Sequence, residues 1–404
     1  FHPLGCFSQG ENNRWYFGNY ATVNFNTVPA STFPVTQYFL IATCSFCVSD
    51  SLGELLFIAR GDMVYDRDLH AIWNCSGLWG DPNTLQPVFT IKKNNEDSIY
   101  FIFSMGTEIS NKGLHYSVFD MRLNNGFGDI VPGMKNLPVA GGENARNNLT
   151  GIRHKNNQDV WIVVNIPSNG GHQYGSFLVS NSGISSMPVI SQSNFLASGG
   201  FHRGEIKISR DGTKLIFTGD TLAEFCKYDC STGMVTPLFR FIPKQEMIGT
   251  NNYACYPEFS NDSKYLYIYG RTTVNPVSVP PDISYHLYQY DASKEDSTQF
   301  MQSEVIIGAD IVYGGLQLAS DNKIYVCRHY KNSLSVIHNP SSYGTSCGFD
   351  SAGFQLISPA SCNVALPQFL QRYKAYIHHS GRCQQLPVAF SADIWPPADT
   401  TLWN

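Results

Sequence analysis

Aspartates that recur at one position of a repeated segment are the first residues in this sequence that could do chemistry. Asp211, Asp262 and Asp321 each follow one short apolar run and precede another. A carboxylate in such a place could bind calcium or serve as an acid or base. An aspartate in a turn also accepts hydrogen bonds from the backbone two residues further on. We interpret all three as turn residues, with structural calcium as the alternative.

The cysteines are the second group with chemical potential. The chain has 11 of them among 404 residues, which is many for a reducing compartment and typical of an oxidising one. Cys44 and Cys47 have the C-x-x-C spacing of redox and zinc sites, but no second pair or nearby histidines complete a zinc site. We therefore predict no metal site. Cys347 and Cys362 flank a loop in the last repeat, and we predict that they form a disulfide.

Sequence motifs of the common enzyme classes are missing. The chain lacks a G-x-S-x-G nucleophile elbow, an H-E-x-x-H zinc motif and a glycine-rich phosphate loop. Its net charge of −5 argues against a nucleic acid or an anionic membrane as partner. No apolar run approaches the roughly 18 residues of a membrane-spanning helix. These observations predict a protein that is not an enzyme, with no catalytic residues, no cofactor and no membrane-spanning segment.

The elements that must position these residues are β-hairpins. Residues 206–217 read I-K-I-S-R-D-G-T-K-L-I-F, in which apolar and polar residues first alternate and a short apolar run follows. The Asp-Gly step between them is a strong signal for a tight turn. Similar segments recur along the chain, clearly at 257–268 and 316–327 and more weakly at 49–59, 94–104 and 155–164.

This repetition predicts an all-β fold built from copies of one unit. The six segments are spaced by roughly 45 to 60 residues, a period typical of solenoids and propellers. A third strand and a more variable fourth follow each hairpin, which makes one propeller blade. Adding the strands near the N-terminus and at 363–373 predicts a seven-bladed β-propeller of the YVTN/WD40 kind, in which the two chain ends share a blade. An array of β-sandwiches is the alternative.

Several motifs, in this order, resemble one known family. They are W-Y-F-G-N-Y-A and N-F-N within 15–26, S-D-S-L-G-E-L-L-F at 49–57, L-H-Y-S-V-F-D-M at 114–121 and G-L-Q-L-A-S-D-N-K-I-Y-V-C-R at 315–328. The chain resembles the N-terminal β-propellers of large cell-surface proteins that gliding bacteria export through the type IX secretion system. In that family PKD-like, immunoglobulin-type domains and a sorting domain follow the propeller. Residues 401–404 resemble the start of a PKD-like motif.

The resemblance implies a domain organisation and a location. It implies an N-terminal tail at 1–13, a β-propeller at 14–374, and a linker with the first strands of a truncated PKD-like domain at 375–404. It also implies a secreted or outer-membrane-associated, extracellular protein that takes part in adhesion, gliding or secretion. The partner would be a protein or glycan at the cell surface, with type IX secretion components among the candidates.

Ligand-binding residues of a propeller are expected in loops at the ends of its central channel. The loops predicted to enter the innermost strands carry Arg153, His154, His202, Arg203, Tyr253 and Tyr313. Arginine and tyrosine are enriched at recognition sites. The alternative is that these side chains fill the channel or bond to neighbouring blades. The sequence thus favours a binding module, with an extracellular polysaccharide hydrolase or lyase and a structural secretion cargo as alternatives.

Overall fold

The repeated hairpin is the unit from which the fold is built. In its clearest copy, β17 (Ile206–Ile208) pairs with β18 (Lys214–Thr218) in antiparallel register. At the turn, Gly212 has a φ of +66°, which glycine adopts without strain. The Ser209 hydroxyl donates to Asp211 Oδ1 at 2.5 Å, and the Thr213 N–H donates to the same oxygen at 3.1 Å. The interpretation of Asp211 as a turn residue is confirmed.

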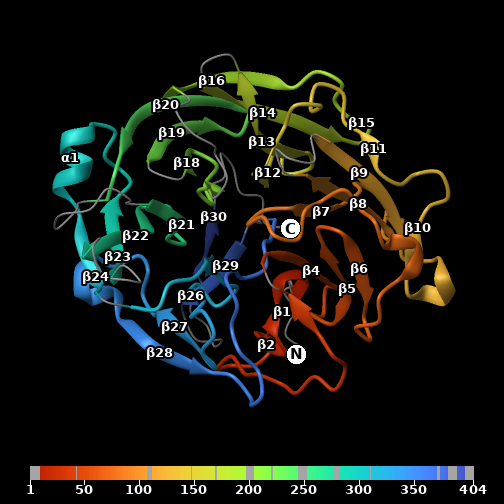
Figure 1. Cartoon of the computed structure of the whole chain (residues 1–404), viewed down its shortest axis with the longest axis horizontal. Coiled ribbons are helices and arrows are strands. Elements are labelled where there is room, and N and C mark those ends of the chain that lie inside the picture. Colours follow the sequence, from red (N-terminus) through yellow and green to blue (C-terminus); the bar gives the residue numbers. More distant parts are fainter. Residues whose placement is uncertain are drawn as a thin grey trace.

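Sheets of this kind form a seven-bladed β-propeller, as the computed structural model in Figure 1 shows. The structure describes residues 10–41, 43–106, 112–146, 148–168, 171–196, 204–219, 222–243, 253–275, 282–309, 311–370, 374–380 and 389–395. Each blade twists away from the axis, and neighbouring blades pack face to face. The predicted fold class is confirmed.

The blades follow one another in chain order. The first holds β1 (Arg14–Asn19), β2 (Ala21–Asn24) and β3 (Leu40–Ile41). The second holds β4 (Ser45–Ser49), β5 (Leu55–Arg60) and β6 (Met63–Asp66). The third holds β7 (Val88–Lys92), β8 (Ile99–Met105), β9 (Leu114–Asp120), β10 (Asp129–Ile130) and β11 (Leu137–Pro138). The fourth holds β12 (Leu149–Arg153), β13 (Val160–Ser168), β14 (Gly171–Ser180), β15 (Gly183–Ile184) and β16 (Val189–Leu196).

The remaining blades have four strands each. The fifth adds β19 (Ala223–Asp229) and β20 (Met234–Phe241) to β17 and β18. The sixth holds β21 (Tyr253–Phe259), β22 (Tyr265–Asn275), β23 (Asp282–Asp291) and β24 (Val305–Gly308). The seventh holds β25 (Leu316–Leu318), β26 (Ile324–Val326), β27 (Ser333–Ile337) and β28 (Phe349–Gln355).

Helices are short in the part of the chain that the structure describes. They are α1 (Ser297–Gln302) and the 3-10 turns η1 (Gly10–Asn12), η2 (Trp73–Cys75), η3 (Asn124–Gly126) and η4 (Gly344–Cys347). A separate antiparallel hairpin, β29 (Lys374–Ser380) and β30 (Ala389–Trp395), follows the blades. Its assignment to a PKD-like domain, like the domain boundaries, stays a prediction.

The ring is closed by hydrogen bonds between the two ends of the propeller. Asn19 of β1 and Ser361 exchange two backbone hydrogen bonds of 2.9 Å. The Gln368 N–H then donates to the Ser45 carbonyl oxygen at 2.8 Å, beside β4. Residues 361–370, which we call the closing segment, therefore join the last blade to the first two. The predicted closure by both ends is confirmed.

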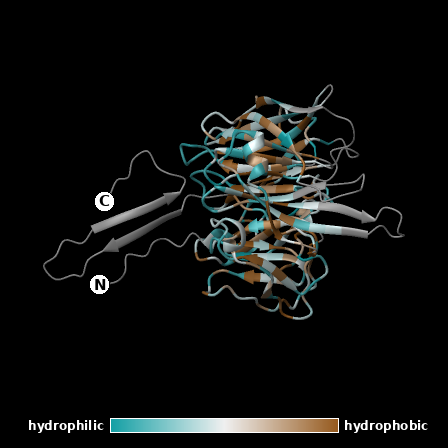
Figure 2. Cartoon of the chain, turned by 90° about the vertical axis from the view of Figure 1, so that its left-hand side faces the viewer, coloured by the Kyte–Doolittle hydropathy of each residue, from teal (hydrophilic) through white to brown (hydrophobic). Residues whose placement is uncertain are grey.

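The hydrophobic core lies between neighbouring blades. Ile152 and Trp161 of the fourth blade, for example, share one buried cluster with Ile208 and Leu215 of the fifth. Figure 2 shows hydrophobic residues along the strands and hydrophilic ones in many of the loops at the edges of the sheets. Because the apolar side chains fill the space between blades, the polar residues of the first strands are left for the channel.

A candidate functional site in the central channel

The first strands of six blades, the second to the seventh, contribute to the wall of the central channel. The strands β4, β7, β12, β17, β21 and β25 contact one another in that order around the ring. Successive side chains of a strand point to opposite faces. Ile206 and Ile208 of β17 pack into the core between blades, so Glu205 and Lys207 point the other way, towards the axis.

Polar side chains from several blades meet there. We call Gln86, Glu205, Lys207, Glu258, Gln317 and Gln368 the channel cluster. Lys207 Nζ donates to Gln317 Oε1 at 2.9 Å and lies 3.0 Å from Glu258 Oε2. Lys207 comes from the fifth blade, Gln317 from the seventh and Glu258 from the sixth. Glu258 and Gln317 are buried, and the Lys207 side chain is 12% exposed. A buried ion pair is stable only when hydrogen bonds satisfy its remaining groups.

Glu258 meets that condition. Its Oε2 also accepts the Leu318 N–H at 2.9 Å, and its Oε1 accepts the Phe259 N–H at 2.9 Å. Both oxygens of the carboxylate are therefore occupied by donors. Lys207, with three N–H groups, uses two of them on Gln317 and Glu258. For its third N–H, the described residues provide no hydrogen-bond acceptor.

Gln86 crosses the channel from the third blade to the fifth. Its amide accepts the Ile206 N–H at 2.8 Å and donates to the Ile206 carbonyl oxygen at 2.9 Å. The same amide donates to Gln368 Oε1 of the closing segment at 3.4 Å. Gln86 therefore links the third blade to the fifth blade and to the closing segment.

Glu205 is the buried carboxyl group of the channel cluster whose pKa is raised. Its side chain is 6% exposed, and within the described ranges no group donates a hydrogen bond to its carboxylate. Burial raises the pKa of Glu205 to about 7. The positive charge of Lys207 acts to lower this pKa, and the negative charge of Glu258 acts to raise it further. A carboxyl group that titrates near neutrality can both take and return a proton.

The sequence contains a signal for this cluster that motif searching missed. Lys207, Glu258 and Gln317 occupy one equivalent position in the repeated segments I-K-I, P-E-F and L-Q-L. A polar residue at the centre of a buried strand in three successive repeats points to a common axis. The sequence alone does not show that these three residues meet, so they were not among the predicted site residues.

Arg153 and His154 are two of the residues that the sequence predicted to bind a ligand. Arg153 ends β12, and its Nη1 donates to the Asn157 carbonyl oxygen at 3.3 Å. His154 Nε2 lies 2.9 Å from the carbonyl oxygen of Ser231, in the fifth blade. Both contacts belong to the hairpin turns. The contact of His154 with a neighbouring blade is the alternative that the sequence left open.

The other predicted ligand-binding residues are aromatic or fall outside the description. The Tyr313 ring stacks on Tyr285 with centroids 4.7 Å apart. Tyr253 begins β21. His202 and Arg203 lie outside the described residues, directly before the segment that carries Glu205. A ligand-binding role for these four stays a prediction.

The predicted disulfide between Cys347 and Cys362 is not present in the structure. Both thiols are free and buried, and they belong to different core clusters. Cys347 packs with Tyr267, whereas Cys362 packs with Cys327. Spacing along the chain misled the prediction, because η4 carries Cys347 away from the closing segment.

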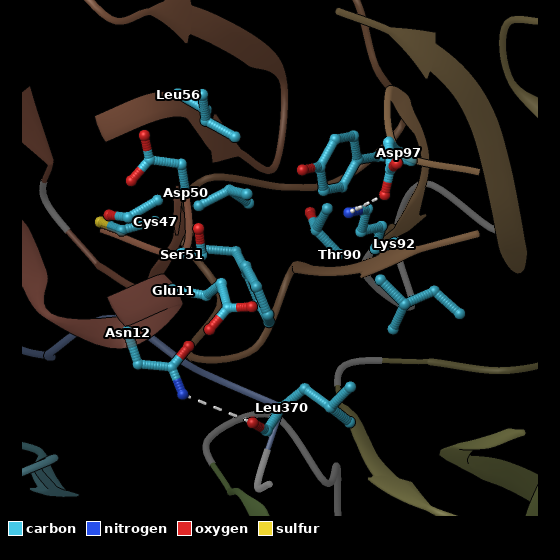
Figure 3. Close-up of a pocket in the computed structure, with 15 residues that line it drawn as sticks. Glu11, Asn12, Cys47, Asp50, Ser51, Leu56, Thr90, Lys92, Asp97 and Leu370 are labelled. Carbon is cyan, nitrogen blue, oxygen red and sulfur yellow. Dashed lines mark hydrogen bonds and ion pairs between the residues drawn. The ribbon is translucent and has the colours of Figure 1, made fainter. Parts of the chain in front are cut away.

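A separate pocket of about 230 Å³ lies between β4 and β7 (Figure 3). Its carboxylates are largely engaged: Asp97 pairs with Lys92 at 3.0 Å, and Asp50 Oδ1 accepts two backbone N–H groups of its own turn. Over the described residues, no group of three or more His, Cys, Asp or Glu side chains is placed to hold a metal ion. The pocket thus has less to offer chemically than the channel cluster.

Comparisons with known proteins add to this geometry. No protein-family model matches the chain, and no curated protein is similar to it in sequence. A protein of Lactobacillus plantarum aligns in structure with a TM-score of 0.52 and 13% identity, over 88% of this chain and 98% of its own. The periplasmic gluconolactonase of Pseudomonas aeruginosa aligns with a TM-score of 0.50 and 10% identity, over 87% and 98%. The fold is one that a lactonase also uses.

This finding overturns the prediction that the chain is not an enzyme. The absent motifs belong to other folds, in which catalytic residues lie close together in sequence. On a propeller, reactive groups come from separate repeats and have no fixed spacing. Their absence as motifs therefore carried no weight against catalysis.

Among the described residues, no helix is both long and apolar enough to cross a membrane.

Proposed function

We propose that the chain is a hydrolase that opens a lactone or related ester of a sugar-derived substrate in the central channel. The observation that carries the proposal is Glu205, a buried carboxyl group without a hydrogen-bond donor in the described residues and with a pKa raised to about 7. The shared fold with a gluconolactonase supports the choice of substrate class.

The roles follow from the geometry of the channel cluster. Glu205, whose pKa is raised to about 7 by burial, acts in its ionised form and removes a proton from a water molecule that attacks the ester carbonyl. Lys207 stays cationic because Glu258 and Glu205 raise its pKa against the effect of burial. Its free N–H stabilises the negative charge that develops on the carbonyl oxygen. Glu205 then returns the proton to the leaving alkoxide.

Cleavage of a glycosidic bond is the second candidate. Two carboxylates, Glu205 and Glu258, stand on either side of Lys207, and such pairs act in glycoside hydrolysis. Glu258 is poorly suited as a nucleophile, however, because donors occupy both of its oxygens. The lactone reading is therefore preferred.

The test is hydrolysis of δ-gluconolactone and a panel of sugar lactones, followed by titration of the released acid. We expect Glu205→Gln to lower kcat/KM by about 10²- to 10⁴-fold, because the general base is lost. Glu224→Gln is the matched control: Glu224 is also buried, but it accepts hydrogen bonds from Tyr174 at 2.6 Å and Ser193 at 2.7 Å and lies outside the channel cluster.

Equal rates for the Glu205→Gln variant and the unchanged protein would contradict the proposal, as would a failure to hydrolyse any lactone. Release of reducing ends from polysaccharides, lost in the Glu205→Gln variant, would favour the second candidate.

The location of the protein is a separate proposal that rests on the sequence resemblance. We propose that it acts outside the cell, as a type IX-exported surface protein with a glycan or protein partner. Fractionation of the source cells, with antibodies against the propeller, tests this point independently of the activity.

A further inference from the structure

Two cysteines meet at the seam where the ring closes. Cys327 directly follows β26 of the seventh blade, and Cys362 belongs to the closing segment. Cys327 Sγ lies 3.1 Å from the carbonyl oxygen of Asn363, the residue after Cys362. The two thiols are in side-chain contact with each other. Residues 35 positions apart in the chain are thus brought together by closure of the ring.

The backbone holds both cysteines in place. The Cys362 N–H donates to the Lys331 carbonyl oxygen at 2.7 Å, and the Tyr330 N–H donates to the Cys362 carbonyl oxygen at 3.1 Å. The Cys327 N–H donates to the Gly315 carbonyl oxygen at 2.9 Å. The segments that carry the two sulfurs are therefore fixed relative to each other before any bond forms between them.

We propose that Cys327 and Cys362 form a disulfide that locks the closing segment to the seventh blade. The bond would replace the thiol contact already present and would cross-link the seam where the two ends of the propeller meet. It is independent of the proposed hydrolase activity.

The chemistry assigns the two sulfurs different roles. Contact with Cys327, assisted by the nearby Arg328, lowers the pKa of Cys362, whereas burial raises that of Cys327. The Cys362 thiolate attacks a small disulfide such as oxidised glutathione and releases one glutathione thiolate. Cys327 then loses its proton, attacks the Cys362 sulfur and releases the second glutathione. Two protein thiols are oxidised and one glutathione disulfide is reduced.

The bond is expected to form during folding. Cys327 is fully buried and Cys362 is 1% exposed, so an oxidant has little access once the ring has closed. Folding in an oxidising environment exposes both thiols to the oxidant before the seam is complete. This order of events decides how the test must be done.

The experiment refolds the full chain with reduced and oxidised glutathione and maps the cysteines by trypsin digestion without reduction. Cleavage at Lys323, Arg328, Lys331 and Arg372 yields peptides 324–328 and 332–372, the second of which contains both Cys347 and Cys362. The Cys347→Ser variant removes that ambiguity. We expect the two peptides to be linked in this variant and unlinked in Cys362→Ser.

Thermal unfolding gives the second readout. A disulfide that closes a loop of this length should raise the Tm of the oxidised protein by about 5 °C over the reduced protein. Cys347→Ser should keep this difference and Cys362→Ser should lose it. Alkylation of both Cys327 and Cys362 after oxidative refolding, with no linked peptide, would overturn the proposal. So would a link from either cysteine to a different one.

Discussion

Glu205 and His172 are buried groups whose protonation affects stability in opposite directions. Burial raises the pKa of Glu205 from 4.5 to about 7 and lowers that of His172 from 6.5 to about 3. Between pH 4.5 and 7 the folded protein keeps the Glu205 proton that the unfolded chain has lost. The stabilisation from Glu205 is therefore complete below pH 4.5 and is lost as the pH rises through 7. That from His172 is lost as the pH falls below 6.5.

A first prediction concerns this pH dependence. Between pH 4.5 and 7 the unchanged protein should lose up to about 3 kcal/mol of its free energy of unfolding through Glu205. The Glu205→Gln variant should not show this loss. The variant should then be more stable than the unchanged protein at pH 8, where the buried charge is fully formed. Urea unfolding of both proteins across this range checks it. The contribution of His172 is the same in both proteins, so it drops out of the difference between the two curves. Parallel curves would contradict the raised pKa of Glu205.

At the scale of the element, the hairpin turn was predictable and the channel cluster was not. The Asp211–Gly212 step fixes a turn through contacts that lie within a few residues, so the local sequence contains all the information. Lys207 meets Glu258 and Gln317 only after three separate blades have packed around an axis. Their common position in the repeats indicates an axis, but not which polar groups pair across it. The spacing of Cys347 and Cys362 along the chain predicted a disulfide that the structure does not contain, again because neighbours in the fold depend on how the blades pack.

The turns themselves give a second prediction. Asp262 repeats the contacts of Asp211, with the Ser260 hydroxyl donating at 2.5 Å and the Lys264 N–H at 3.1 Å. Changing either aspartate to alanine should lower the free energy of unfolding by about 1–2 kcal/mol, because the serine and the backbone lose their acceptor. Asparagine at the same position keeps an acceptor oxygen and should recover most of the loss. Chemical denaturation measures both. Equal destabilisation by alanine and asparagine would mean that the charge, not the acceptor, matters.

On the scale of the whole molecule, contacts between the two ends of the propeller close the ring. The Asn12 side chain donates to the Leu370 carbonyl oxygen at 3.5 Å, which places the two ends of the propeller beside each other. Ring closure by both ends could be predicted because the six repeated segments, together with the strands near the N-terminus and at 363–373, add up to seven blades. The partners across the seam could not, since they are separated by more than 300 residues in the chain.

This arrangement predicts tolerance to circular permutation. Joining residues 370 and 10 by a short Gly/Ser linker and opening the chain between Asn124 and Asn125, both exposed in η3, should preserve cooperative unfolding. Deleting residues 361–370 should instead remove most of the roughly 5–15 kcal/mol that keeps a domain folded. Circular dichroism during heating distinguishes the two. The prediction would be contradicted if the permutant failed to fold while the deletion variant folded. The contacts of residues 361–370 would then not be needed to hold the ring together.

The bridge that Gln86 builds across the axis has a consequence for turnover. Gln86 is bonded to Ile206, the residue next to Glu205, and to Gln368, so a substrate bound at Glu205 would have this bridge beside it. If this bridge stays closed during turnover, substrate and product would use the same end of the channel. The acid released from a lactone would then compete with the next lactone molecule for the same route. Hydrolysis is therefore expected to show product inhibition.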